Sequence, residues 1–186
     1  VSGAVAQFPI GKISDIYDRR KVIVFSTFGA AFFSILAILV SRQMYLPGGL
    51  ATSKTWFYIF FILFSFCSLP MFSLILAHTN DYISKDKFVA AGAGLQFLFG
   101  LGAISGPFLC SIIMDAVGNN GFFIFLFFFH AVIGIFGIYR MRVRGTVDNP
   151  DSQFVAMPQT ITPAGIELNP TTEPIEEPNK DENKII

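Results

Sequence analysis

The stretch GFFIFLFFFHAVIGIFGIY, Gly121 to Tyr139, decides the fold class of this chain, because it is apolar on every face of a helix. A soluble domain of this size could not bury such a helix on all sides. Of the 186 residues, 53% are hydrophobic and only 14% are charged, where a soluble domain carries roughly a quarter. We therefore expect an integral membrane protein.

Three further apolar runs are long enough to cross a bilayer, whose core of about 30 Å takes roughly 20 helical residues. Lipid offers the backbone no hydrogen-bond partner, and these runs lack the alternating polar residues of a barrel strand. We predict an all-α bundle of transmembrane helices, with spans at 22–41, 56–77, 88–114 and 121–139. The apolar opening, 1–11, has no charged segment before it, so we interpret it as the end of a helix begun upstream, and the chain as a fragment.

Basic residues are shared unequally between the two ends of these spans. One end has nine Lys or Arg, and the other has only Arg42 and Lys54, so the positive-inside rule predicts that the first end is cytoplasmic. Residues 1–144, the predicted membrane region, carry a net charge of +6, and residues 145–186 carry −6. This acidic, Pro-rich tail is expected to be cytoplasmic and mostly disordered. The nine basic residues are Lys12, Arg19, Arg20, Lys21, Lys85, Lys87, Arg140, Arg142 and Arg144.

Several classes of function have no support in the sequence. Cys67 and Cys110 lie in apolar runs without a CxxC pair or a His at ligand spacing, so no metal site and no cofactor are predicted. Enzyme chemistry is not expected, because paired buried carboxylates, GxSxG, HExxH and P-loop motifs are all absent from the sequence. The basic residues sit at span ends rather than among stacking aromatics, so nucleic acid is not an expected partner.

The segment GKISDIYDRRK, residues 11–21, connects the first two apolar helices on the predicted cytoplasmic side. It resembles the loop motif of the major facilitator superfamily, roughly G-x-x-x-D-R-x-G-R-R/K, which recurs between the second and third helices of each six-helix half. Ile16 stands where the motif has Arg, and Asp18 stands where it has Gly, which is typical of a weaker second-half copy. The residues that match are Gly11, Asp15, Arg19 and Arg20.

The resemblance implies that the chain comprises the end of helix eight and helices nine to twelve of that fold. The stretches AQFPIGKISD, LPMFSLILAHTND and FLFGLGAISGPFL are similar to the YcaD-like branch of bacterial permeases. By this resemblance, the protein is a secondary transporter of a bacterial inner membrane that moves a small solute by alternating access. Its substrate site would be shared with an absent N-terminal half.

Two interpretations of the motif remain open. In the first it is a positive-inside anchor, in which Arg19 and Arg20 contact phosphate headgroups while Asp15 accepts from backbone donors at a neighbouring helix N-terminus. Gly11 would then let the chain leave a closely packed helix. In the second, implied by the resemblance, the motif is a latch between the halves that is made and broken during transport.

The span 88–114 is rich in small residues. They would let helix backbones approach closely, and Pro107 permits a kink because it has no N–H. Static packing explains this pattern, and a helix that bends as the cavity opens explains it as well. The residues that would form the hinge or the packing face are Gly102, Gly106 and Pro107.

Polar residues at membrane depth are candidates for a substrate path. Gln96 could line a cavity or form an interhelical hydrogen bond, and His130 could be a satisfied structural histidine or a proton carrier. His78, Asn80 and Asp81 cluster at a predicted cytoplasmic helix end, where they form either an ordinary helix C-terminus or a gate facing the substrate.

A second class of function is a membrane scaffold that does not transport. Its tail would recruit a cytoplasmic partner, and its Phe-rich helices would face lipid and partner without a cavity. Polar side chains on inward faces distinguish the two classes, and Gln96 and His130 favour a transporter.

Overall fold

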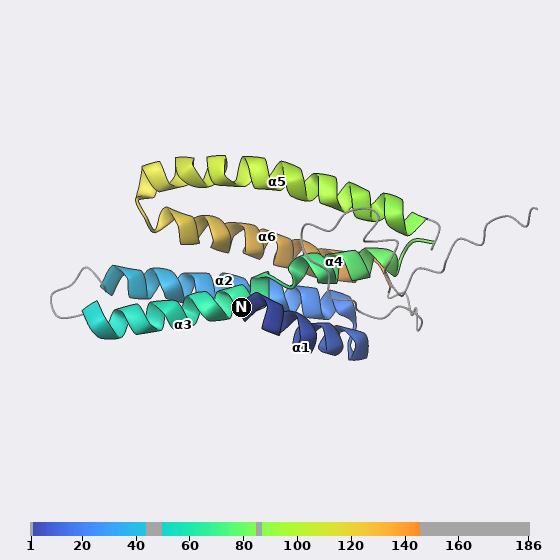
Figure 1. The fold of residues 1–186 in the computed structure, drawn as a ribbon, viewed down its shortest axis with the longest axis horizontal. Helices are drawn as coiled ribbons and strands as arrows, with labels where there is room; N and C mark the ends of the chain where they lie inside the picture. Colours follow the sequence, from blue (N-terminus) through green and yellow to red (C-terminus); the bar gives the residue numbers. More distant parts are fainter. Residues whose placement is uncertain (1, 44–49, 85–86, 146–186) are drawn as a thin grey trace, which may run out of the picture.

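The computed structural model describes residues 2–43, 50–84 and 87–145, and in these ranges it has helices and no strand (Figure 1). Four segments are long and apolar enough to cross a membrane: Arg19–Ser41, Ser53–Asn80, Phe88–Val117 and Gly121–Val143. The predicted all-α fold is confirmed. The helices are α1 (Ser2–Ile16), α2 (Arg19–Gln43), α3 (Leu50–Ser68), α4 (Met71–Asn80), α5 (Phe88–Val117) and α6 (Gly121–Val143).

Helix α2 is the centre of the bundle and packs along both α3 and α6. Small side chains one turn apart make a fully buried stripe on it, which allows close approach on both sides. In Figure 1 the C-terminal ends of α1, α4 and α6 lie at the same end of the bundle as the N-terminal ends of α2 and α5. We call this the basic end. The members of the buried stripe are Thr27, Ala30, Ser34 and Ala37.

Two glycines of α6 set its distance from α2. A Cβ at Gly134 would lie 2.9 Å from the ring of Phe28, and a Cβ at Gly137 would lie 2.6 Å from a methyl group of Val24. A side chain at either position would force Phe28 or Val24, or the helices themselves, to move. At the opposite end of the bundle, Ser41 Oγ donates a hydrogen bond of 2.6 Å to Asn120 Oδ1 and ties α2 to the turn before α6.

The predicted span 56–77 is present as an apolar segment, but it is not one helix. It is interrupted at Leu69 and Pro70, which separate α3 from α4. Pro70 has no N–H to donate to the carbonyl of Phe66, and its ring clashes with that carbonyl in a continuous helix. The proline is fully buried, so the break lies inside the bundle.

The segment 11–21, expected to connect the first two apolar helices, is mostly helical itself. Helix α1 continues to Ile16, and only Tyr17 and Asp18 separate it from α2. The sequence KISDI contains polar residues but no helix breaker, so it ends the apolar stretch without ending the helix. Gly11 therefore lies inside α1, where its carbonyl accepts a 2.7 Å hydrogen bond from Ser14 Oγ.

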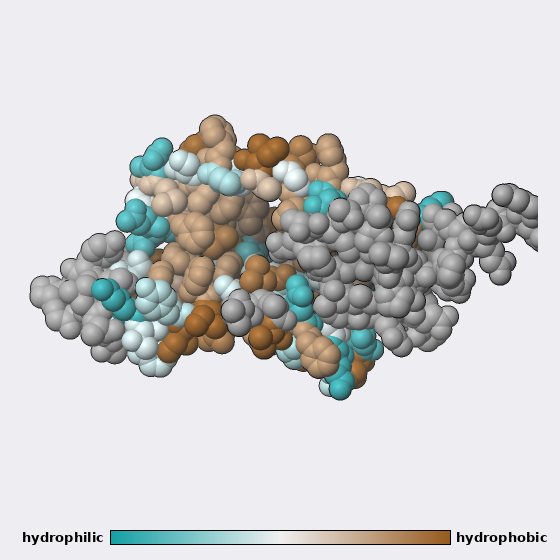
Figure 2. Space-filling view, in the orientation of Figure 1, coloured by the Kyte–Doolittle hydropathy of each residue, from teal (hydrophilic) through white to brown (hydrophobic). Residues whose placement is uncertain are grey.

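Apolar side chains cover much of the visible surface of the described helices, as Figure 2 shows in brown. Phe25 is 80% exposed and Ile104 is 79% exposed in the isolated chain. None of the most apolar stretch of α5 is buried within the described residues. Such a surface requires lipid or further helices against it. Apart from Gly145, the predicted disordered tail, 145–186, lies outside the described residues.

Candidate functional site

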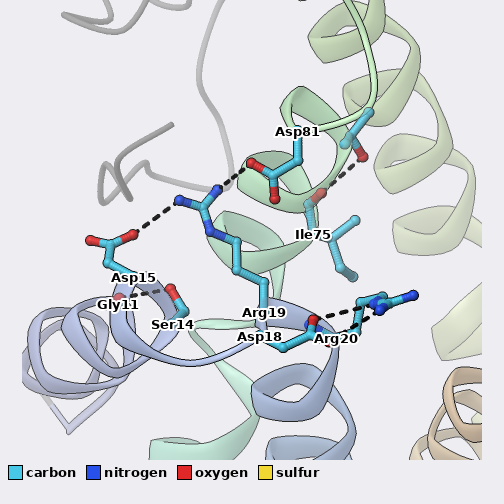
Figure 3. Close-up of polar contacts among 9 residues, drawn as sticks. Gly11, Ser14, Asp15, Asp18, Arg19, Arg20, Ile75 and Asp81 are labelled. Atoms are coloured by element: carbon cyan, nitrogen blue, oxygen red, sulfur yellow. Dashed lines mark hydrogen bonds and ion pairs between the residues drawn. The ribbon is translucent and has the colours of Figure 1, made fainter. Parts of the chain in front are cut away.

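A single arginine joins three helices at the basic end (Figure 3). Arg19, the first residue of α2, lies 3.0 Å through Nη2 from Asp15 Oδ1 of α1, and 3.0 Å through Nη1 from Asp81 Oδ1 at the C-terminus of α4. The side chain of Arg19 is only 7% exposed, and that of Asp81 is 12% exposed. We call these three residues the Arg19 cluster.

Every charge in the Arg19 cluster stands at the less favourable end of its own helix. Asp15 and Asp81 lie at the C-terminal ends of α1 and α4, where the helix dipole disfavours an anion by about 0.3–1 kcal/mol. Arg19 stands at the N-terminus of α2, where the dipole disfavours a cation. Helix stability therefore does not explain these residues, and their mutual attraction must outweigh the dipoles.

Asp18 occupies a position where the superfamily motif has Gly, and the structure gives it two roles. Its Oδ1 accepts a 3.0 Å hydrogen bond from the backbone N–H of Arg20, which caps α2, and its Oδ2 pairs with Arg20 Nη2 at 3.1 Å. Burial works against the charged form of Asp18, but the hydrogen bonds and charge of Arg20 outweigh it and hold the pKa of this carboxyl below its ordinary value.

Arg20 also connects the motif to the end of the last helix. Its Nη1 donates to the carbonyl oxygens of Arg144 at 2.7 Å and of Gly145 at 3.1 Å. The two motif arginines thus have different partners, because Arg19 reaches α1 and α4 while Arg20 reaches the end of α6.

The three polar residues predicted at the end of α4 have different surroundings in the structure. Asp81 belongs to the Arg19 cluster. The ring of His78 packs edge-on against the ring of Tyr82, with 5.0 Å between the ring centroids. Asn80 is 6% exposed, and its Oδ1 has no hydrogen-bond partner among the described residues. An unpaired buried oxygen is costly, so Asn80 is poised for a further donor.

His130 has hydrogen bonds at both ring nitrogens. Its Nδ1 lies 2.7 Å from the carbonyl oxygen of Leu126, which can only accept, so Nδ1 carries the hydrogen. Its Nε2 then accepts from Ser68 Oγ at 3.0 Å, which links α6 to the last residue of α3. This geometry favours a structural histidine over a proton carrier.

The candidate residues of α5 have few contacts with the other described residues. The Oε1 atom of Gln96 is buried without a hydrogen-bond partner among the described residues. Helix α5 runs without interruption through Pro107, and no described atom lies within 4 Å of a Cβ placed at Gly102 or Gly106. Close packing at these glycines requires residues beyond the described ones.

No group of three or more His, Cys, Asp or Glu side chains able to hold a metal ion occurs in the ranges that the structure describes. The interactions within the Arg19 cluster are electrostatic. The ion pairs between its guanidinium and the two carboxylates can form and break without a covalent step.

Membrane-length apolar helices, an apolar outer surface and a buried ion-pair cluster at one end define a multi-spanning integral membrane protein of the helix-bundle class. The sequence matches the Major Facilitator Superfamily over residues 1–171, and the chain belongs to that family.

Relatives support the same assignment. An uncharacterized MFS-type transporter of Yersinia enterocolitica is 26% identical over 156 residues, which are 84% of this chain and 36% of that protein. Uncharacterized MFS-type transporters of Yersinia pestis and Yersinia pseudotuberculosis are 24% identical over the same shares. The chain thus spans about a third of the length of these relatives. The comparisons do not assign a branch within the superfamily, and no solved structure matches the chain.

Proposed function

We propose that the chain is the C-terminal part of a secondary active transporter, which moves a small solute across a bacterial inner membrane by alternating access. Family membership and the MFS-type relatives support transport rather than catalysis. The observation that carries the mechanism is the Arg19 cluster, which ties three helix ends together through charges that their own helices disfavour.

In this proposal the Arg19 cluster is a latch that closes one side of the transporter. Arg19 is buried between Asp15 and Asp81 when the basic end is closed, and opening separates α4 from the turn between α1 and α2. Removing one partner of a buried ion pair is destabilising, so we expect the closed state to depend most on Arg19 and Asp81, the two largely buried members of the Arg19 cluster. A made-and-broken contact of this kind suits rocking between two halves.

The proposed orientation places the basic end and the C-terminus in the cytoplasm. The motif arginines and the basic residues of the last turn of α6 gather at this end, as the positive-inside rule requires. The solute and the direction of its movement follow from residues of both halves.

The proposed partner of this chain is an N-terminal half of the same transporter. Its helices would cover the exposed surface of α5, including Gly102 and Gly106, and would supply donors or a solute to Gln96. The alternative, a scaffold that recruits a partner through its tail, is not favoured by the comparisons.

A transport comparison across many solutes at once tests the proposal. Membrane vesicles containing the full-length protein are loaded with a cytoplasmic extract, and the accumulated solutes are compared between wild type, Asp81→Asn and Asp115→Asn. Asp115 is an acid of the last turn of α5, at the opposite end of the bundle, and is the matched control. We expect at least one solute whose movement needs the protein and is impaired by D81N but not by D115N. Identical solute profiles with and without the protein would refute transport.

A further inference from the structure

Beside the Arg19 cluster, a pocket of about 240 Å³ opens between α2, α4 and α6. Arg20 of α2 borders it on one side, and Arg140 and Arg144 border it from the end of α6. His78 and Tyr82 border it from α4 and the turn that follows. This volume is room for a compact polar group.

The lining of this pocket is strongly positive. Three arginines are among its lining residues, and none of the described residues that line it is Asp or Glu. Arg20 is neutralised by Asp18, but the side chains of Arg140 and Arg144 have no hydrogen bond or ion pair within the described part of the chain. Two unpaired cations held near each other repel, and an anion between them would relieve that repulsion.

The dipole of α6 alone does not explain the positions of Arg140 and Arg144, whereas the pocket does. The dipole of α6 favours any cation in its last turn, and Arg142 satisfies that preference equally well. Arg140 lies in the last turn of α6, Arg144 caps the helix one turn further on, and both border the pocket. Arg142 is exposed and does not border it.

The depth of the pocket indicates the source of the anion. The apolar spans of α2 and α6 begin and end at this level, at Arg19 and Val143, which places the opening where lipid headgroups lie. Tyr82 at its rim is 39% exposed, and tyrosine is enriched at this depth. Tyr139 and Val143, near the end of α6, are each 60% exposed and offer apolar surface to acyl chains at this level.

We propose that this pocket binds the phosphate of an anionic lipid headgroup. Arg140 and Arg144 donate forked hydrogen bonds to the phosphate oxygens, as guanidinium groups do to phosphate, and the Tyr82 hydroxyl donates from the rim. Basic pockets between transmembrane helices are known to take such headgroups. The inference does not depend on transport, because it needs only the bundle and its place in the membrane.

Lipid retention by the purified full-length protein tests the proposal. Detergent-solubilised protein is incubated with phosphatidylglycerol or phosphatidylcholine, and bound lipid is counted by native mass spectrometry. We expect wild type and Arg142→Gln to retain phosphatidylglycerol in preference to phosphatidylcholine. The double variant Arg140→Gln/Arg144→Gln should lose about tenfold in affinity for phosphatidylglycerol. These two side chains have no partner in the described bundle, so their removal spares the fold.

Three results would overturn the proposal. Equal retention of the two lipids by wild type would remove the need for an anionic headgroup, and an equal loss in R142Q would reduce the effect to general surface charge. Displacement of phosphatidylglycerol by millimolar inorganic phosphate would identify soluble phosphate as the ligand. Stronger lipid binding after removal of residues 150–186 would identify the acidic tail as the occupant.

Discussion

In the proposed latch, Arg19 is the residue on which the closed state of the basic end depends most. Its guanidinium holds carboxylates from two other helices, and neither carboxylate is favoured by its own helix dipole. Lysine would not replace it well, because one ammonium lacks the planar fork that reaches two partners in different directions. The sequence indicated Arg19 through the motif, but Asp81 lies 62 residues away and its pairing required the fold.

Removing Arg19 should destabilise the protein measurably. Arg19→Gln removes the guanidinium that Asp15 and Asp81 share, and we expect a loss of about 1–3 kcal/mol, since Asp15 is partly screened by solvent. Unfolding of the purified protein in mixed micelles measures the effect. Arg142→Gln, an exposed basic residue, is the control, and an equal effect of both substitutions would contradict the role of the Arg19 cluster.

Asp18 predicts a dependence of stability on pH. Because the folded-state pKa of this carboxyl lies below its ordinary value, its contribution to stability is complete above the unfolded pKa of about 3.9 and is lost as the pH falls through the folded value. Asp18→Asn can still cap α2 but cannot form the ion pair. The difference in Tm between wild type and D18N should therefore be constant above about pH 5 and should shrink below it. A difference that grows toward acid pH would contradict this assignment.

At the scale of the elements, apolar length predicted four runs, and each lies within a segment that is long and apolar enough to cross a membrane. It did not predict the break at Pro70 or the continuation of α1 through KISDI, because hydropathy reports where lipid ends and not where a helix ends. The glycine-rich sequence drew attention to α5, whereas the close helix contact within this chain lies at Gly134 and Gly137 of α6. Single glycines in a Phe-rich run become significant only when their neighbours are known.

The contact between α6 and α2 should be intolerant of added bulk. Gly137→Val introduces a branched side chain where even a Cβ would lie 2.6 Å from Val24, so we expect a loss of about 1–3 kcal/mol from overpacking. Gly94→Val on α5 is the matched control, since no described atom lies within 4 Å of its Cβ position. Unfolding in mixed micelles compares the two variants. If G137V were no less stable than G94V, the close packing of α6 on α2 would be wrong.

At the scale of the whole molecule, the two ends of the described bundle differ in their polar contacts. At the basic end, arginines and carboxylates from four helices meet. At the opposite end, Ser41 and Asn120 share one hydrogen bond. This asymmetry suits a protein whose charged end opens and closes. The charge pattern of the sequence predicted the asymmetry. The different partners of Arg19 and Arg20 became known only from the folded arrangement.

The accessibility of the basic end measures the latch most directly. A single reporter cysteine is introduced at Thr79, which borders the pocket at the basic end, in full-length protein with Cys67 and Cys110 replaced. Its labelling by a membrane-impermeant maleimide is followed in inside-out vesicles. The latch predicts that Asp81→Asn accelerates labelling about tenfold, because a weakened Arg19 cluster populates the open state, while Asp115→Asn does not. Equal labelling rates in wild type, D81N and D115N would contradict it.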